Sequence, residues 1–521
     1  KYDTLQEAVD AASSGATVTL LRDTKENVTV SKNNIVLDLN GHTLNGSTGE
    51  REAALKIDNK KVTVKDSSAD QSGVIMREDV DSLDVTGSSS YYVIDIQGDS
   101  GLLKFESGNV KNTSGIPGVK GASLVRLGYD GNRKAKPTLN IVGGTFTQDN
   151  FVAIKVDYGT FYLQGGTINS ANSYAVENWC NAFIKGGTVN GTVSTWVDST
   201  GIASSKLEIS GGKVNGNVCS VNYDSAADKQ ARLYITGGEV TGTLGTYTYS
   251  NGLVPTETTA MATIEVTGGT FDIDPSKYVT EDAKVSKDGE KFGVAKAALC
   301  KIGDTEYYTF DEAFKARKDG DTIVMLRNYS TKSEQLSGTK SYTIDLNGNT
   351  WTYTDTTDPD SAAFEINNPN VTLTVKNGTV VSSQFLGMIP SANSFTGTIT
   401  YDNAGLVFEK VEATANGHGG IDTNGNNTSD TVTLKNSTLN VPNGYGIYFP
   451  SSGTLTIDNS TINAKTMGVQ VCAGSLSINA GSTITVSDDA VPKTENDGAI
   501  QDGAAISIVN RTGYKGLGNI T

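Results

Sequence analysis

The sequence predicts an all-β protein of two tandem β-solenoids, each opened by a short N-terminal capping α-helix. Three observations support this prediction. The phrase LDLNGHTL at residues 37–44 returns as IDLNGNTW at residues 344–351. Double glycines recur every twenty-odd residues between these two phrases. The composition, with 58 glycines, 10 prolines and abundant Thr, Val, Ser and Asn, is typical of short strands joined by tight turns.

An amphipathic helix is predicted at the start of each copy. Each begins with a capping box, in which a threonine and a glutamate three residues later satisfy each other's backbone N–H groups. The capping boxes are Thr4 with Glu7 and Thr309 with Glu312. Apolar residues follow at helical spacing, and a glycine is expected to end each helix in the left-handed conformation. The helices are therefore expected over residues 4–14 and 309–319, each followed by a five-residue strand.

A shorter repeat lies inside the first copy, where alternating strands end in a double glycine. The doublets are Gly143–Gly144, Gly165–Gly166, Gly186–Gly187, Gly211–Gly212, Gly237–Gly238 and Gly268–Gly269, at steps of 22, 21, 25, 26 and 31 residues. In the second copy LKNSTL, IDNSTI and INAGSTI follow one another at steps of 23 and 22. A period in the low twenties with several short strands indicates a β-solenoid, whose rungs stack about 4.8 Å apart.

The phrase LDLNG is explained by such a rung. Leu37 and Leu39 would point inward and Asp38 outward, while Asn40–Gly41 would turn the corner, where positive φ is tolerated. Asparagines at the same corner of successive rungs can link their side-chain amides into a ladder. Since Asn349 replaces His42 in the second copy, His42 is expected to be structural.

The repeats divide the chain into three segments. A solenoid's first rung exposes unpaired strand edges and an open apolar core, which the predicted helices would cover. Residues 276–300 break the period and are charged, as expected of a closing hairpin and linker. The segments are residues 1–275, a first module; 276–300, the hairpin and linker; and 301–521, a second module.

Charge and cysteine content exclude several classes of partner and fold. The formal net charge of −16 makes nucleic acid and anionic membrane surfaces improbable partners, and no apolar run is long enough for membrane insertion. The four cysteines lack CxxC spacing, so neither a zinc ribbon nor a disulfide scaffold is expected. Buried single thiols are the expectation for them.

These motifs together are similar to those of a known family. The helix TLQEAVDAA, the phrases TVTLLRD and LDLNGHTL, and the repeated GGTF resemble the right-handed parallel β-helix modules of the pectate-lyase-like superfamily, especially in large surface proteins of Gram-positive bacteria. The resemblance covers nearly the whole chain and implies a right-handed coil and an extracellular or cell-wall-attached location. It implies no single activity, because the superfamily includes lyases, hydrolases, adhesins and passenger domains.

Aromatic residues recur beside acids at comparable places in six successive periods of the first module, and we call this set the aromatic column. Its members are Tyr129, Asp130, Asp157, Tyr158, Glu177, Trp179, Trp196, Asp198, Tyr223, Asp224, Tyr247 and Tyr249. Such residues can form a platform for sugar rings, with carboxylates accepting hydroxyl hydrogen bonds. They can equally stabilise the sheet by cross-strand packing. The basic segment YDGNRKAKP at residues 129–137 lies beside the column and could approach an anionic sugar.

Candidates for catalysis and metal binding are weaker. Glu177 and Asp198 are the first pair to test as acid and base, and Lys155 could face Glu177 from a neighbouring rung. Residues 417–430 place Asp422, Asn424 and Asn426 at alternating positions, as in an oxygen-rich Ca²⁺ loop. The segment lacks the glycine and glutamate of an EF-hand, so a polar turn without any cofactor is the expectation.

The first hypothesis is a non-catalytic, adhesin-like surface module that presents an elongated face to a glycan or a host surface protein. A lyase or glycoside hydrolase acting on a complex glycan through Glu177 and Asp198 is the alternative. A structural spacer within a surface protein is the second alternative. The sequence does not distinguish the oligomeric state.

Overall fold

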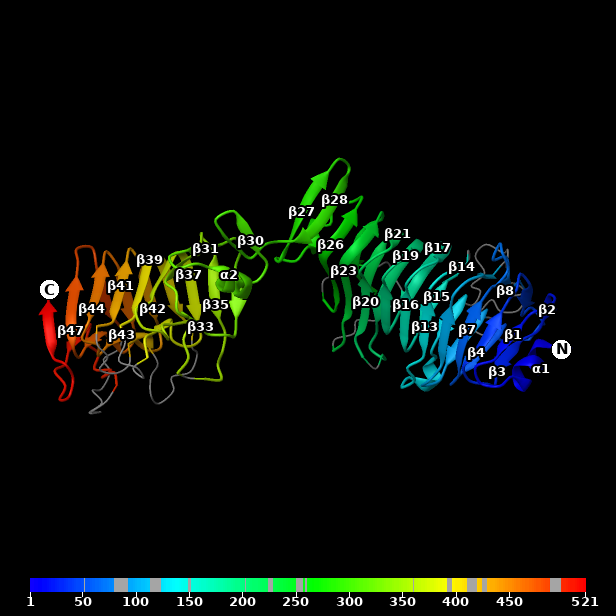
Figure 1. Cartoon of the computed structure of the whole chain (residues 1–521), viewed down its shortest axis with the longest axis horizontal. Coiled ribbons are helices and arrows are strands. Elements are labelled where there is room, and N and C mark those ends of the chain that lie inside the picture. The colour runs from blue at the N-terminus through cyan, green and yellow to red at the C-terminus, as the bar shows by residue number, and fades with distance from the viewer. Residues whose placement is uncertain are drawn as a thin grey trace. The chain divides into compact units, whose positions relative to one another are not determined.

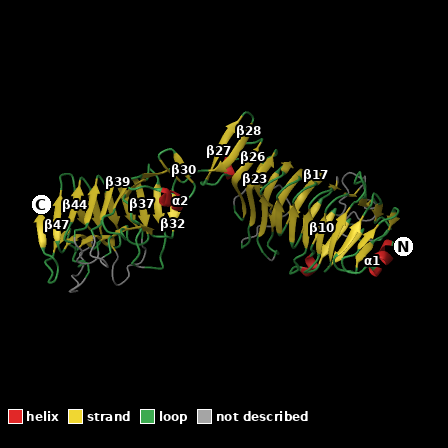
Figure 2. Ribbon diagram, in the orientation of Figure 1, coloured by secondary structure: helices red, strands yellow, loops and turns green. Residues whose placement is uncertain are grey.

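The computed structural model describes residues 1–50, 52–78, 92–112, 123–148, 151–201, 203–223, 228–249, 256–257, 260–358, 360–390, 396–409, 419–423, 429–487 and 498–521. This part of the chain is nearly all β, with long parallel sheets, as predicted (Figure 2). It divides into two compact units, Lys1–Lys296 and Ala297–Thr521, which are considered separately (Figure 1). The α-helices of the described residues, α1 and α2, have seven residues each, well short of a membrane span.

The strands of unit 1 form three parallel ladders in its described residues, and the chain visits the three in turn. The first ladder contains β1 (Thr17–Thr19), β4 (Ile35–Asp38), β7 (Lys61–Lys65), β10 (Leu102–Phe105), β13 (Thr138–Ile141), β16 (Thr160–Leu163), β18 (Asn181–Ile184), β20 (Ser205–Ile209), β23 (Ala231–Val240) and β26 (Ala262–Phe271). The second contains β2 (Thr24–Lys25), β5 (Thr43–Asn45), β8 (Val74–Arg77), β11 (Asn109–Asn112), β14 (Thr145–Gln148), β17 (Thr167–Asn178), β19 (Thr188–Val197) and β21 (Lys213–Asn215), followed by the ends of β23 and β26.

The third ladder carries the candidate site described below. It contains β3 (Val28–Val30), β6 (Leu55–Asp58), β9 (Ile94–Gln97), β12 (Val125–Leu127), β15 (Ile154–Val156), the second halves of β17 and β19, β22 (Val218–Tyr223) and β24 (Leu244–Tyr249). The short strand β25 (Thr256–Glu257) pairs with β24 in the antiparallel sense. Each ladder strand thus has as neighbour the strand that follows it by one sequence period.

Residues in register form apolar columns inside unit 1. Leu139, Phe161 and Ala182 occupy equivalent positions on successive strands, and all three are fully buried. The alternate residues face outward, as the two-residue period of a strand requires. One continuous hydrophobic core therefore extends from the first ladder strand to the last.

The double glycines stack at the corner between the first and second ladders. The second glycine of each doublet has positive φ, for example 84° at Gly144 and 78° at Gly166. A Cβ atom on Gly166 would lie 2.6 Å from the carbonyl oxygen of Gly144, closer than any real contact. The corner needs glycine both for its left-handed backbone and for the close approach of the preceding rung.

The LDLNG phrase behaves largely as predicted. Leu37 and Leu39 are buried, and Asn40 and Gly41 have φ of 47° and 79°. Asp38 lies on the outward side of β4, opposite to these two leucines, as predicted, but only 5% of this residue is exposed. Its Oδ1 accepts hydrogen bonds from the backbone N–H groups of Asn40 and of Ser67 in the next rung, which covers it.

The predicted amide ladder at a corner occurs in unit 2, where Asn403 donates to Asn377 at 3.1 Å. In unit 1 an amide ladder lies instead on the strands of the second ladder. Asn215 donates to Asn190 at 2.8 Å and Asn190 donates to Asn169 at 2.7 Å, so amides link three successive rungs. His42 Nδ1 lies 3.4 Å from Asp23 Oδ1, and Asp23 also accepts from the N–H of the next residue, Thr43. The second copy keeps that backbone contact between Asn328 and Thr350.

Both capping boxes are present, but the helices are shorter than expected. α1 spans Leu5–Ala11 and α2 spans Phe310–Ala316. Gly15 and Gly320 do not cap them, because the chain is already extended at Ala12 and Arg317. Instead, the N–H group of Gly15 donates to the carbonyl oxygen of Asn34, and that of Gly320 to the carbonyl oxygen of Ser341. Each acceptor residue directly precedes the next strand of the first ladder.

Hairpins close unit 1 and open unit 2. After the turn η3 (Ser276–Tyr278), β27 (Ala283–Asp288) and β28 (Lys291–Lys296) form an antiparallel hairpin that pairs with β26. This hairpin belongs to the first compact unit. At the start of unit 2, the hairpin of β29 (Cys300–Ile302) and β30 (Thr305–Tyr307) pairs with the first ladder strand, β31.

Unit 2 repeats the three-ladder plan in its described residues. The first ladder contains β31 (Thr322–Met325), β34 (Tyr342–Asp345), β37 (Thr372–Ser382), β39 (Thr398–Phe408), β41 (Thr431–Lys435), β44 (Thr454–Asp458), β47 (Gly474–Ile478) and β50 (Leu517–Ile520). The second contains β32 (Tyr329–Thr331), β35 (Thr350–Tyr353), the ends of β37 and β39, β42 (Thr438–Val441), β45 (Thr461–Ala464) and β48 (Thr483–Val486). The third contains β33 (Gln335–Leu336), β36 (Phe364–Glu365), β38 (Gly387–Met388), β40 (Gly419–Asp422), β43 (Tyr445–Phe449), β46 (Met467–Val471) and β49 (Ile506–Ile508).

Replacing Phe310 by alanine is expected to destabilise unit 2 by about 3–5 kcal/mol, because its buried ring packs 4.8 Å from the Trp351 ring at the start of the core. The W179F/W196F background leaves Trp351 as the sole tryptophan, so its fluorescence during urea unfolding measures unit 2. Tyr308→Ala, at an exposed neighbouring position, should change the midpoint little. Equal midpoints for F310A and Y308A would contradict this packing role.

Candidate functional site

The aromatic column lies on the outer face of the third ladder of unit 1. Trp196 pairs with Val221, and Val221 pairs with Tyr247 on the next strand. Trp179 directly follows Asn178, which is in register with Thr195. The two tryptophans therefore occupy equivalent positions on neighbouring rungs, about 4.8 Å apart along the ladder.

Four rings of the column, those of Trp179, Trp196, Tyr223 and Tyr247, form a cluster with the ring of Tyr174, which is not a column member. The Trp179 and Trp196 rings stack at 5.4 Å and 25°, and Tyr174 meets Trp196 edge-on at 5.5 Å. The Tyr223 ring lies 6.0 Å from that of Trp179. Trp196 is only 6% exposed and donates from Nε1 to Ser194 Oγ at 2.7 Å, whereas Trp179 is half-buried. Trp196 thus supports the cluster and Trp179 presents more of its surface.

A pocket of about 930 Å³ opens beside the stacked tryptophans, and we call it the basic pocket. Six column residues line it, namely Tyr129, Asp157, Tyr158, Trp179, Trp196 and Asp198. Its walls come from residues 129–136, which include the turn η2 (Asp130–Asn132), and from residues 198–204. Glu177, Tyr223 and Tyr247 do not line it. Asp224 and the side chains of Asp130 and Tyr249 lie outside the described residues.

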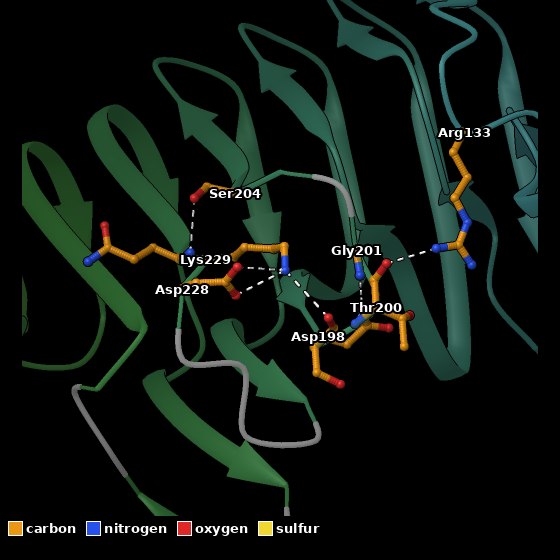
Figure 3. Close-up of polar contacts among 9 residues, drawn as sticks. Arg133, Asp198, Thr200, Gly201, Ser204, Asp228 and Lys229 are labelled. Atoms are coloured by element: carbon orange, nitrogen blue, oxygen red, sulfur yellow. Dashed lines mark hydrogen bonds and ion pairs between the residues drawn. The ribbon is translucent and has the colours of Figure 1, made fainter.

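Hydrogen bonds hold the 198–204 wall between its neighbours (Figure 3). Arg133 Nη1 donates to the Thr200 carbonyl oxygen at 2.8 Å across the pocket mouth. Asp198 Oδ1 accepts from the N–H of Thr200 at 2.9 Å and from its hydroxyl at 3.0 Å. On the far side, Lys229 Nζ donates to the Ser199 carbonyl oxygen at 3.4 Å. Asp198 therefore shapes the loop that forms the wall.

A row of charged residues runs across the third ladder on its outer face, and each member precedes the column residues of its own rung in sequence. Asp95, Arg126, Lys155 and Glu177 are in register on β9, β12, β15 and β17. Arg126 donates to both oxygens of Asp95, at 2.9 and 2.8 Å, and its guanidinium lies 4.2 Å from the Tyr92 ring centroid. Burial lowers the pKa of Arg126, but the Asp95 carboxylate outweighs this effect and the net shift is upward. Arg126 is therefore a fixed cation on the pocket wall.

Lys155 and Glu177 are the last two members of this row. Lys155 Nζ lies 3.6 Å from Asp157 Oδ1 and lines the basic pocket. Glu177 Oε1 accepts from Trp179 Nε1 at 2.8 Å. Burial raises the pKa of Glu177, although Lys155 and the indole N–H oppose this effect. The Glu177 carboxylate, which does not line the pocket, thus orients the Trp179 ring.

The basic pocket has a positive lining in an acidic chain. Its described lining residues include five basic side chains, Arg126, Arg133, Lys134, Lys136 and Lys155, and two acidic ones, Asp157 and Asp198. The formal balance of the lining is +3, and it is +1 when Asp95 and Glu177, which neighbour Arg126 and Lys155 from outside the lining, are included; the whole chain has −16. Lys134 and Lys136 are exposed at the rim. The sequence indicated the basic segment, but it did not indicate Arg126, which requires the register between β9, β12 and β15.

A second pocket of about 550 Å³ lies at the other end of the same strands, and we call it the polar pocket. Its lining is Ala171, Asn172, Ser173, Tyr174, Thr192, Asn217, Val218, Cys219, Val221, Thr243, Gly245 and Tyr247. Asn217 Oδ1 accepts from the Thr243 N–H at 3.0 Å and from its hydroxyl at 2.9 Å. Sequence analysis assigned only Tyr247 to a site here, because the other lining residues, which are mostly small polar and apolar side chains, form no recognisable motif.

The candidate metal loop in unit 2 has a structural role at its one described ligand. Asp422 is 8% exposed and its Oδ2 accepts from the Tyr445 hydroxyl at 2.9 Å. Asn424 and Asn426 lie outside the described residues. Within the described ranges, no three His, Cys, Asp or Glu side chains are grouped as metal ligands. The four cysteines form no disulfide, and Cys180 alone among them is partly exposed.

A carboxylate pair in unit 2 was not indicated by the sequence. Glu334 precedes β33 and Glu365 lies on its partner β36, and their side chains share a hydrogen bond. Burial, followed by the charges of Glu365 and Asp358, raises the pKa of Glu334 to about 7, against a hydrogen bond from the Ala362 N–H. A proton shared between the two carboxyl groups would relieve their mutual repulsion.

No protein-family model matches the chain, and no curated protein matches it.

The fluorescence of Trp179 should titrate with Glu177. In the W196F/W351F background, the midpoint is expected above pH 4.5, because burial raises the pKa of the carboxyl group that accepts from the indole. The E177Q variant keeps an acceptor oxygen but should lose the transition. Since the folded pKa is raised, this group's stabilisation is full at low pH and is lost as the pH rises through that pKa. An unchanged transition in E177Q would exclude Glu177 as its source.

Glu334→Gln should raise the free energy of unfolding of unit 2 relative to wild type. This gain should be roughly 1 kcal/mol larger at pH 8 than at pH 5, after allowance for solvent screening. The folded pKa of about 7 exceeds the ordinary 4.5, so the wild-type contribution present below pH 4.5 is lost as the pH rises through 7. Glutamine can keep the Ala362 contact and remains neutral. Urea unfolding followed by Trp351 fluorescence tests this expectation, and the same pH dependence in wild type and E334Q would refute it.

Proposed function

We propose that each unit winds as a right-handed parallel β-helix of the pectate-lyase-like kind, and that unit 1 is a non-catalytic glycan-binding module of an extracellular, adhesin-like surface protein. The three-ladder topology and the stacked corners support the proposed fold. The basic pocket beside the Trp179–Trp196 stack is the observation on which the proposed activity depends.

The pocket suits a sugar in both shape and chemistry. Pyranose rings have an apolar face that packs on an indole, while amides, hydroxyls and charged groups around the ring bind its hydroxyls. Trp179 supplies the flat face, and Asn181, Thr160 and Asp157 supply polar groups on the same wall. A concave site of this size favours a small flexible ligand over the flat surface of a folded protein partner.

The charge of the pocket favours an acidic sugar. Lys134, Lys136 and Arg133 stand at the mouth, and Lys155 lies deeper beside Asp157. The acidic remainder of the chain repels long polyanions, while a local positive potential attracts a single carboxylate. An acidic glycan is therefore the proposed ligand class.

Binding without bond cleavage is the favoured activity because both candidate acid–base residues have other partners. Asp198 Oδ1 holds the 199–201 turn, and Glu177 accepts from Trp179 Nε1. A hydrolase needs two carboxyl groups facing one another across the scissile bond. Glu177 does not line the pocket.

Trp179→Ala should weaken binding to an acidic glycan at least about tenfold, or ~1.4 kcal/mol, because the stacking face is lost. Retention on a glycan array, followed by calorimetry on the best ligand, measures the effect. Tyr162→Ala is a matched control, because Tyr162 is a half-buried aromatic stacked on Phe183 on the first ladder.

Two results would count against the proposal. Equal retention by W179A and wild type would remove the tryptophan platform. New reducing ends or unsaturated products released from the bound glycan by the wild-type chain would instead favour the enzyme. An unchanged circular dichroism spectrum for W179A ensures that loss of binding does not reflect unfolding.

A further inference from the structure

We propose that a single linear oligosaccharide spans the basic and polar pockets, with an acidic sugar in the basic pocket and neutral sugars in the polar pocket. This inference rests on the proposed glycan-binding function and extends it. It identifies the polar pocket as a second subsite and gives the ligand a direction.

Two strands run beneath both pockets. On β19, Thr192 lines the polar pocket and Trp196 lines the basic pocket, four residues or about 13 Å further along the strand. On β17, Tyr174 lines the polar pocket, and Trp179, just past the strand, lines the basic pocket. The pockets therefore lie at opposite ends of the same two strands.

The aromatic cluster forms the wall that the two pockets share. Tyr174 from the polar pocket meets Trp196 from the basic pocket at 5.5 Å. Tyr247 and Val221 of the polar pocket pack in the same cluster as Trp179. A ligand that leaves one pocket in the direction of the other therefore crosses aromatic surface, on which sugar rings pack well.

The two pockets differ in charge, which orients the ligand. No described residue lining the polar pocket carries a formal charge, and its polar groups are amides and hydroxyls such as Asn172, Ser173 and Thr192. These groups bind sugar hydroxyls and N-acetyl groups. A carboxylate placed there would lose water without gaining a cation, whereas the lysines of the basic pocket supply one.

The rungs involved set the length of the ligand. The basic pocket reaches from Tyr92, just before β9, to Trp196 on β19, and the polar pocket from Tyr174 on β17 to Tyr247 on β24. The two overlap at β17 and β19, so the path is diagonal over seven rungs, or about 29 Å along the ladder. A ligand of four or more sugars fits this span better than a disaccharide.

The test compares three probes by calorimetry with the full chain. They are lacto-N-tetraose, which is neutral; the same tetrasaccharide with one terminal sialic acid; and tetragalacturonate, which is acidic at every sugar. The sialylated probe should bind at least tenfold more tightly than either of the others. Lys134→Gln with Lys136→Gln should reduce its advantage over the neutral parent, and Lys287→Gln with Lys296→Gln, exposed on the β27–β28 hairpin, is the charge-matched control.

The polar pocket is tested by filling it. Asn172 is exposed, so Asn172→Trp obstructs the pocket without disturbing the core. It should weaken binding of the sialylated probe at least tenfold and change binding of free N-acetylneuraminic acid by less than twofold. Tyr247→Ala should also weaken binding of the sialylated probe.

Three results would overturn the inference. Equal effects of N172W on the sialylated probe and on the free acid, or no effect on either, would remove the second subsite while the loss in W179A still supported the first. Equal binding of tetragalacturonate and the sialylated probe would refute the neutral assignment. Failure of the wild-type chain to bind any probe would reject the proposed function as well.

Discussion

Close stacking of backbone at the glycine corners is the constraint on which the rest of unit 1 depends. At Gly165, Gly186 and Gly268 a Cβ atom would lie 2.2–2.4 Å from a carbonyl oxygen of the preceding rung. No side chain fits there, so the backbone of each glycine corner packs directly against the corner of the preceding rung. The strands before and after the corner therefore pair with those of the preceding rung in a fixed register. A shift by one residue would turn every inward side chain outward.

The same register brings charged side chains together on the outer face. Residues 20 to 40 positions apart in sequence become neighbours, which is how Asp95, Arg126, Lys155 and Glu177 form one charged row. The pocket walls come from segments that leave the strands, where no pairing limits their length. These segments lengthen as the repeat grows from 22 to 31 residues, so the site can vary while the core stays constant.

Unit 2 reaches the same topology with different corner chemistry. Asparagines replace many of the glycines, with φ of 48° at Asn436 and 44° at Asn459, and Asn459 donates to Asn436 at 2.9 Å. Its aromatic residues Tyr445, Tyr448 and Phe449, on strand β43 of the third ladder, are buried. The same scaffold therefore directs aromatic rings into packing in one unit and to a pocket wall in the other.

Local sequence alone determined the all-β class, the repeat, the capping boxes at Thr4 and Thr309, and the inward leucines, because each depends on residues within one strand, turn or helix end. Only the tertiary structure decided that Asp38 is covered by the next rung, that Arg126 binds Asp95, and that small polar residues near Tyr174 line a second pocket. Those features depend on which residues of distant rungs meet, and no single stretch of sequence encodes that contact.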